Sequence, residues 1–353
     1  MANKRKYIKK IINISEQITL FLINIIRNIV YKHSNYDEFC LAEDIAAPII
    51  KRLSSLSEFD YRLLMERKED TSSIPEPLKY KTAIVMQGPI IDDKAYTINT
   101  ALWYRKLYPD AIIIISTWIG ESEKIRESAL MNNIICQENA KPDLAGRENV
   151  NYQLISTKKG IEIAIKHGAQ RILKTRNDQR FRYPSFLNLF EKWMEIFENS
   201  EELINKIIVP AYQKDYPFMI GDYYSYSSCE VMRKLFSIPI DKCSINREIL
   251  DTQYNRIRQA FEQKNYTEED IIDWRDYMLA ESYIFYNYWL LNYEERKTKN
   301  PVNAYKEFIG NQLLVLDENL LRMHWSKYDR SVNNIDYRDV KYERTVDWIT
   351  RKR

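Results

Sequence analysis

Glycine is scarce in this sequence, which has only 7 glycines among 353 residues. Neither GxGxxG nor GxxxxGK[ST] occurs anywhere in the chain. These glycine-rich loops mark dinucleotide-binding and P-loop enzymes, because glycine lets the backbone approach phosphate groups closely. The sequence therefore offers neither of the two best arguments for a classical dinucleotide-binding or P-loop enzyme.

Histidine and cysteine are also few. The chain has 3 histidines and 4 cysteines, and no CxxC pair occurs. This composition argues against a zinc site and a histidine-rich metal site. No secretion signal precedes the cysteines, so we expect reduced thiols and a cytoplasmic location. A net charge of only +3 gives no reason to expect a nucleic-acid partner.

Residues 1–79 contain no long hydrophobic run. The longest uninterrupted apolar segment before Lys32 is Leu20–Ile23, far below the roughly 20 residues that a membrane-spanning helix needs. Apolar residues instead recur at helical spacing, at Ile11, Ile14, Ile18, Leu22, Ile25 and Ile29. This extension is therefore predicted to be helical, basic and amphipathic. It would either lie on the anionic inner face of the cytoplasmic membrane or dock on its own domain or a second copy of the chain.

Beyond the polar, proline-marked stretch EDTSSIPEP (69–77), strand and helix patterns alternate, so we place a domain boundary close to Tyr80. The predicted elements are a strand from 82 to Gly88-Pro89, a helix over 94–108, a strand over 111–118, a helix over 121–132, a strand over 133–138, a helix over 151–167 and a strand over 171–175. This alternation predicts an α/β domain with a mainly parallel sheet flanked by helices.

In such sheets, ligands bind at the carboxyl ends of the strands. Three predicted strands end in polar residues: Gln87-Gly88, Ser116-Thr117-Trp118 and Arg176-Asn177-Asp178. A lone carboxylate among Lys174, Arg176 and Arg180 suits Mg²⁺ or Mn²⁺ together with the phosphates that such a metal bridges. The alternative is an internal Asp–Arg ion pair that fixes a loop.

Four segments resemble one family in order along the chain: IVMQGPI (84–90), YRKLYPDAIIIISTW (104–118), NVNYQLISTKKGIEIA (149–164) and LKTRNDQRF (173–181). They are similar to the WavE-type lipopolysaccharide biosynthesis proteins, bacterial glycosyltransferases of the GT-A-like nucleotide-diphospho-sugar transferase class. The resemblance spans roughly residues 80–330. It implies a GT-A-like fold and a nucleotide-sugar donor.

The resemblance also implies roles for residues on the rim. GT-A enzymes end the fourth strand with a DxD-like motif that holds a metal against the diphosphate, whereas this chain offers Asp178 alone. A divalent metal, Mn²⁺ or Mg²⁺, is thus expected on Asp178, and His324 in the C-terminal segment is a second candidate ligand. The expected nucleotide-sugar contacts are Gln87, Gly88, Pro89, Thr117, Asn151, Gln153, Lys174, Arg176 and Asp178. For Asn151 and Gln153, helix capping stays open as an alternative.

The second half of the chain is expected to form the acceptor side. DWRDYMLAESYIFYNYWLLNY (273–293) reads as one apolar helix with Glu281 inside it. A partly buried acid there could take the proton from an acceptor hydroxyl. Glu281 is therefore the expected catalytic base, with Asp222 and Asp276 as alternatives and a salt bridge as the structural alternative for Glu281. Tyr223, Tyr224 and Tyr226 could line a sugar site.

These inferences predict a helical extension (1–79), a GT-A-like domain (80–335) and a basic, solvated C-terminal tail (336–353) anchored by two aromatic residues, Tyr342 and Trp348. The predicted function is transfer of a sugar from a nucleotide-sugar donor to a lipopolysaccharide, capsule or related glycan, free or lipid-linked. A non-catalytic glycan-assembly scaffold and a sugar-phosphate nucleotidyltransferase are the alternatives. The sugar, the nucleotide, the acceptor, the stereochemistry and a homo-oligomeric state are left open.

Overall fold

The structure is a computed structural model that describes residues 75–198, 206–245, 247–292, 300–326, 330–331, 342–345 and 348. The predicted N-terminal extension, with its membrane or oligomer contact, lies almost wholly outside the described residues. Among the helices that are described, none is long and apolar enough to cross a membrane. Cys136, Cys229 and Cys243 are free thiols.

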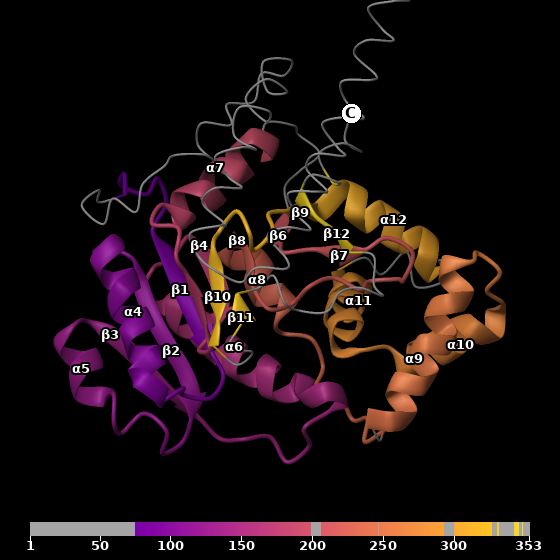
Figure 1. Cartoon of the computed structure of the whole chain (residues 1–353), viewed down its shortest axis with the longest axis horizontal. Coiled ribbons are helices and arrows are strands. Elements are labelled where there is room, and N and C mark those ends of the chain that lie inside the picture. Colours follow the sequence, from indigo (N-terminus) through magenta and orange to yellow (C-terminus); the bar gives the residue numbers. More distant parts are fainter. Residues whose placement is uncertain are drawn as a thin grey trace, which may run out of the picture. The chain divides into compact units, whose positions relative to one another are not determined.

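A seven-stranded sheet organises the domain (Figure 1). Its strands, in spatial order, are β3 (Ile134–Asn139), β2 (Ile112–Trp118), β1 (Thr82–Gln87), β4 (Arg171–Arg176), β8 (Ser225–Ser228), β6 (Ile207–Val209) and β9 (Leu313–Val315). All neighbouring strands pair in parallel except β8, which is antiparallel to both β4 and β6. The predicted α/β class, with a mainly parallel sheet flanked by helices, is confirmed.

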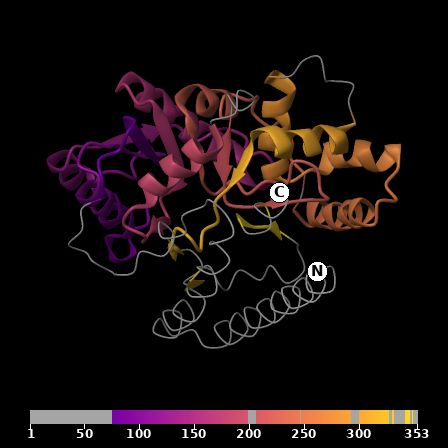
Figure 2. The ribbon, with the colours of Figure 1, turned by 90° about the horizontal axis from the view of Figure 1, so that it is seen from above.

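Helices cover both faces of the sheet. The described helices are α4 (Tyr96–Leu107), α5 (Arg126–Met131), α6 (Val150–Lys166), α7 (Phe186–Glu198), α8 (Cys229–Leu235), α9 (Arg247–Glu262), α10 (Glu268–Tyr277), α11 (Ala280–Asn292) and α12 (Pro301–Gln312). The chain runs β1, β2, β3 in one direction along the sheet and then returns to β4. Right-handed crossovers therefore place α4 and α5 on one face and α6 on the other. In both ribbon views α9 and α10 lie at the end of the domain away from α5 (Figure 2).

The centre of the sheet is buried on both faces, which explains its continuous apolar strands. All six residues of β1 are buried, and β2 is buried from Ile113 to Trp118. Gly160 allows α6 to approach β1 closely, because a Cβ at this position would lie 2.4 Å from Cγ1 of Val85. This close packing fixes the distance between α6 and β1.

Two small sheets complete the domain. β10 (Met323–Trp325) pairs with β5 (Gln179–Phe181) and with β11 (Arg330–Ser331), and β12 (Tyr342–Glu343) pairs with β7 (Tyr212–Gln213). In the segment predicted to be a solvated tail, Thr345 and Trp348 are only 2% exposed. At least this part of the tail packs on the domain.

The prediction of a single helix over 273–293 was wrong. The helix breaks at Met278, which has the extended dihedral angles φ −61° and ψ 147°, so α10 ends at Tyr277 and α11 begins at Ala280. The break is stabilised by Arg147, whose Nη1 donates to the carbonyl oxygen of Met278 at 2.7 Å. Glu281 consequently lies in the first turn of α11 and not in the body of a helix.

Candidate functional site

The carboxyl ends of β1 and β4 lie side by side at the point where the chain connections diverge. The backbone N–H of Asn177 donates to the carbonyl oxygen of Gln87 at 2.9 Å, and that of Gly88 donates to Ser116 at 3.1 Å. Gly88 has φ +107°, a conformation that favours glycine. Such switch points are where open α/β sheets bind ligands.

Asn177 is 1% exposed at this point. Its amide nitrogen donates to the carbonyl oxygen of Gly88, while its amide oxygen has no hydrogen-bond partner among the described residues. Buried polar atoms are normally hydrogen-bonded. An unpaired acceptor beside Gly88 therefore suits a ligand hydroxyl or N–H group.

Arg176 and Asp178 form a bidentate ion pair at the end of β4. Nε and Nη2 of Arg176 donate to Oδ1 and Oδ2 of Asp178 at 2.9 and 3.0 Å. The Asp178 side chain is 8% exposed and that of Arg176 is 27% exposed. Burial alone would raise the pKa of Asp178, but the Arg176 guanidinium outweighs it and holds this pKa below its usual value. The ion pair that the sequence left open is present, and it leaves the guanidinium half-buried at the rim.

Strand β10 supports this pair from the side. The guanidinium carbon of Arg176 lies 5.3 Å from the ring centroid of Trp325, within range of a cation–π interaction. The backbone N–H of Ser326 donates to the carbonyl oxygen of Asp178 at 2.9 Å. His324 lies on the same strand, and its Nδ1 is 2.9 Å from the Tyr96 hydroxyl.

The predicted metal ligands do not form a ready metal site. Both oxygens of Asp178 accept hydrogen bonds from Arg176, so a metal ion would compete with a guanidinium that is already in place. Nδ1 of His324 is engaged with Tyr96. In the described part of the chain, no group of three or more His, Cys, Asp or Glu residues could hold a metal ion. The expected divalent metal stays a prediction, and this donor set does not fit it.

Several of the other predicted nucleotide-binding side chains form hydrogen bonds with other residues of the protein. Gln87 accepts from the Ser156 hydroxyl at 3.0 Å, and the Thr117 hydroxyl donates to Glu121 at 2.6 Å. Asn151 is completely buried and exchanges hydrogen bonds with the backbone of Asp241 on both its amide oxygen and its nitrogen. Pro89 is exposed at the rim. Asn151 therefore holds a loop through its amide, and its nucleotide contact stays a prediction.

Lys174 joins this rim to a second cluster. Its side chain is fully buried, and its Nζ donates to the carbonyl oxygen of Asp222. Gln153 approaches the same oxygen at 3.5 Å. Burial lowers the pKa of Lys174 to about 8. A single strand, β4, thus reaches both the Arg176–Asp178 pair and the backbone of Asp222.

Three carboxylates from distant parts of the sequence form the second cluster. Burial raises the pKa of Glu281 well above its usual value, and the charges of Asp222 and Glu148 raise it further. Oε2 of Glu148 accepts a hydrogen bond from the backbone N–H of Ala280 at 3.1 Å. Glu281 and Asp222, which the sequence proposed as base and alternative base, are therefore electrostatic neighbours. Asp276 lies on α10, on the other side of the break from Glu281.

The three tyrosines expected near a sugar site are not equivalent. Tyr224 and Tyr226 are 0% exposed and belong to the core. Tyr223 is half-buried, and its ring centroid lies 5.3 Å from that of Trp325. Only Tyr223 is placed to contribute to a site at the rim.

Sequence reasoning missed Glu148, and it assigned no role to Tyr96 or Trp325. Glu148 precedes a helix by two residues and carries no motif. Its partner, Ala280, is 132 residues away. Only the fold brings the two together.

These features define an α/β protein whose candidate site, with the Arg176–Asp178 ion pair, lies at the switch point of its sheet. The chain belongs to the WavE lipopolysaccharide synthesis family, which it matches over residues 82–351. The earlier resemblance is thereby confirmed, and the family associates the chain with lipopolysaccharide synthesis. No curated protein matches the chain.

Solved structures show only distant similarity. One is a glycosyltransferase involved in glycosylation of the major capsid of PBCV-1, with 9% identity, 67% of this chain and 81% of that chain covered, and a TM-score of 0.29. Another is a cytidylyltransferase from Leptospira borgpetersenii serovar Hardjo-bovis, with 13% identity, 52% and 73% covered, and a TM-score of 0.27. A third is a nucleoside-diphosphate-sugar pyrophosphorylase from Vibrio cholerae RC9, with 9% identity, 69% and 95% covered, and a TM-score of 0.31.

Proposed function

We propose that this protein is a glycosyltransferase that moves a sugar from a nucleotide-sugar donor to a growing lipopolysaccharide or related surface glycan. The proposal rests mainly on β4, which connects the Arg176–Asp178 pair to the carboxylate cluster. One strand supplies a guanidinium suited to a diphosphate and, through Lys174, contacts the loop of the carboxylate cluster. Family membership in lipopolysaccharide synthesis supports the glycan acceptor.

The donor would bind at the switch point. Arg176 presents a half-buried guanidinium that Asp178 and Trp325 hold in one orientation. Because Nε and Nη2 of Arg176 donate to Asp178, a phosphate oxygen would bind at the other N–H groups of the guanidinium. The fixed orientation would reduce the entropy lost on binding. The unpaired amide oxygen of Asn177 would accept from a ribose hydroxyl or a base N–H group.

The reaction would be a direct displacement at the anomeric carbon. The acceptor hydroxyl oxygen forms a bond to this carbon as the bond to the nucleoside diphosphate breaks. The ionised Glu281 takes the proton of the hydroxyl, and Arg176 neutralises charge that develops on the leaving diphosphate.

The test is sugar-nucleotide turnover by the purified full chain. UDP-, GDP- and CMP-sugars would be incubated with and without lipopolysaccharide core oligosaccharides, and products would be measured by mass spectrometry. Transfer or slow donor hydrolysis that is lost in Glu281→Gln supports the proposal. Release of pyrophosphate from a nucleoside triphosphate and a sugar phosphate would instead identify a nucleotidyltransferase. The absence of any turnover would count against the proposal and favour a non-catalytic scaffold.

A further inference from the structure

The loop that leads into α6 is held in a conformation that residues with side chains rarely adopt. Glu148 and Asn149 have φ angles of 45° and 66°, and Gly146 has φ 69°. A Cβ at Gly146 would lie 2.9 Å from Nδ2 of Asn151. Left-handed backbone at non-glycine residues persists only where the surrounding contacts determine it. The contacts of this loop should therefore explain why Glu148 is held there.

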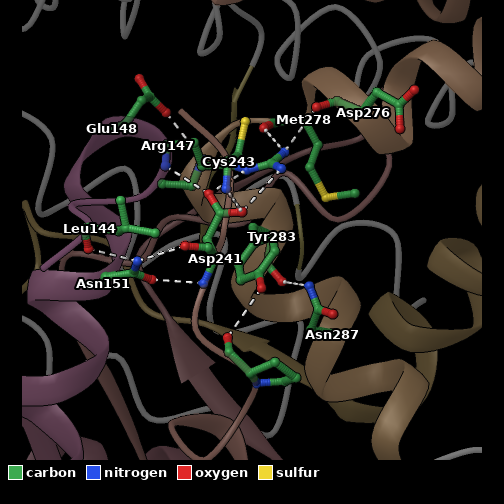
Figure 3. A network of polar contacts seen from close by, with 12 residues as sticks. Leu144, Arg147, Glu148, Asn151, Asp241, Cys243, Asp276, Met278, Tyr283 and Asn287 are labelled. Atoms are coloured by element: carbon green, nitrogen blue, oxygen red, sulfur yellow. Dashed lines mark hydrogen bonds and ion pairs between the residues drawn. The ribbon is translucent and has the colours of Figure 1, made fainter. Parts of the chain in front are cut away.

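Arg147 fixes the loop from the inside (Figure 3). Its backbone N–H and its Nε both donate to Oδ2 of Asp241, at 2.7 and 3.0 Å. Its Nη1 donates to the carbonyl oxygen of Met278 at 2.7 Å, and its guanidinium carbon lies 5.1 Å from the ring centroid of Tyr283. Arg147 thus binds the loop to the break between α10 and α11.

Glu148 makes the next contact along the same surface. Its carboxylate accepts from the backbone N–H of Ala280, the first residue of α11. The first N–H groups of a helix have no partner within the helix, and a negative charge near them is favourable. Glu281 follows Ala280 directly, so the residue that anchors α11 also lies next to the expected base.

We propose that Glu148 is a positioning residue for Glu281: its carboxylate anchors the first turn of α11 and sets where the Glu281 carboxyl group lies relative to Asp222. The role of Glu281 as base rests on the proposed function. The anchoring of α11 by Glu148 does not.

Several titratable groups face Glu281 from the elements around it. They are Asp222 before β8, Glu148 in the turn before α6, Tyr216 after β7 and Tyr254 on α9. Tyr216 is 1% exposed, and its hydroxyl has no hydrogen-bond partner among the described residues. Glu148 itself faces Arg247 and Asp251 of α9. Because Glu148 adds a negative charge beside Glu281, removing that charge should let Glu281 ionise at a lower pH.

The test uses the full chain without any substrate. The free energy of unfolding would be measured against pH in the wild type and in Glu281→Gln, and their difference isolates Glu281. As pH rises above about 4.5, a glutamate in the unfolded chain loses its proton while Glu281 in the folded chain keeps it. The folded state then binds more protons, so this difference falls with pH until Glu281 ionises and levels off above that point.

The same two curves, with and without Glu281→Gln, would be measured in a Glu148→Gln background. A Glu162→Gln background is the matched control. Glu162 is an exposed residue of α6 that pairs with Lys159. We expect the levelling-off pH to move down in Glu148→Gln and to stay in place in Glu162→Gln. Equal curves in the two backgrounds would overturn the proposal.

A second variant separates position from charge. Gln at position 148 keeps an oxygen that can accept from Ala280, whereas Ala does not. Once a donor is known, the limiting rate at high pH should fall further in Glu148→Ala than in Glu148→Gln, by about tenfold. Equal losses in the two variants would contradict positioning. If the unfolding curves shift as expected and no donor is ever turned over, the proposed function fails while the position of the Glu148 carboxylate beside Glu281 stands.

Discussion

The two clusters of the candidate site are built in different ways. The Arg176–Asp178 pair joins residues two positions apart at the end of one strand, and β10 supports it from the side. The carboxylate cluster gathers Glu148, Asp222 and Glu281 from three distant segments. A local arrangement can be inferred from the order of residues along a strand, whereas the second arrangement depends on the whole fold.

The largest expected effect on activity tests the carboxylate cluster. Glu281→Gln should lower kcat by about 10²- to 10⁴-fold, the usual contribution of a general base, and should leave nucleotide affinity unchanged. Rates would be measured by donor turnover, with Glu230→Gln, an exposed residue of α8, as the control. A loss of affinity that matches the loss of rate would place Glu281 at the donor.

The pH dependence of the wild-type rate follows from the same residue. Because burial and neighbouring carboxylates raise the pKa of Glu281, kcat/KM should rise with pH through a value well above that of an ordinary glutamate. The rise comes from ionisation of the base. A rate that falls over this range would show that the protonated acid is the active form.

The network behind the cluster should dominate stability. The Arg147 and Asp241 side chains are 7% and 4% exposed, and breaking a buried ion pair by removing one partner typically costs about 3–5 kcal/mol. Arg147→Met should therefore reduce the free energy of unfolding by this amount, as measured by urea titration. Lys159→Met, which breaks an exposed pair with Glu162, should change it by less than about 0.5 kcal/mol. Similar losses in the two variants would contradict a structural role for the network.

Lys174 links the two clusters, and its ionisation should be visible in stability. Its pKa is lowered to about 8 by burial, while an unfolded lysine keeps its proton up to about pH 10.4. Between these values the unfolded state binds more protons, so the free energy of unfolding should rise with pH, by up to about 3 kcal/mol. Lys174→Met should lack this rise. Parallel curves for the two proteins would show that Lys174 titrates normally.

Sequence reasoning succeeded where the chemistry is local. Runs such as AIIIISTW are apolar on both faces, so β2 and its carboxyl end could be predicted. The ion pair between Arg176 and Asp178 could be named as an alternative because both residues follow the same strand. The metal at Asp178 was predicted from the same local pattern of charges and from the family resemblance, and the geometry of the ion pair does not favour it.

Sequence reasoning failed where a distant residue determines the local structure. The segment 273–293 has the apolar content of one helix, yet Arg147 stabilises a break at Met278, 131 residues away in the sequence. No spacing within the segment reveals this partner. For the same reason Glu148 could not be found, since its role depends on the position of Ala280.

The most direct test of the central claim is nucleotide binding at the end of β4. Thermal stability of the full chain would be measured with UDP, GDP, CDP and CMP, each with Mn²⁺ and with EDTA. A ligand present at a hundred times its Kd should stabilise the protein by about 2.7 kcal/mol. The matched variants are Arg176→Met and Arg182→Met, the latter at an exposed position.

We predict stabilisation by one nucleotide that persists in EDTA, is lost in Arg176→Met and is kept in Arg182→Met. Stabilisation that requires Mn²⁺ would instead support the predicted metal site at Asp178. No stabilisation by any nucleotide would contradict a donor site at the end of β4.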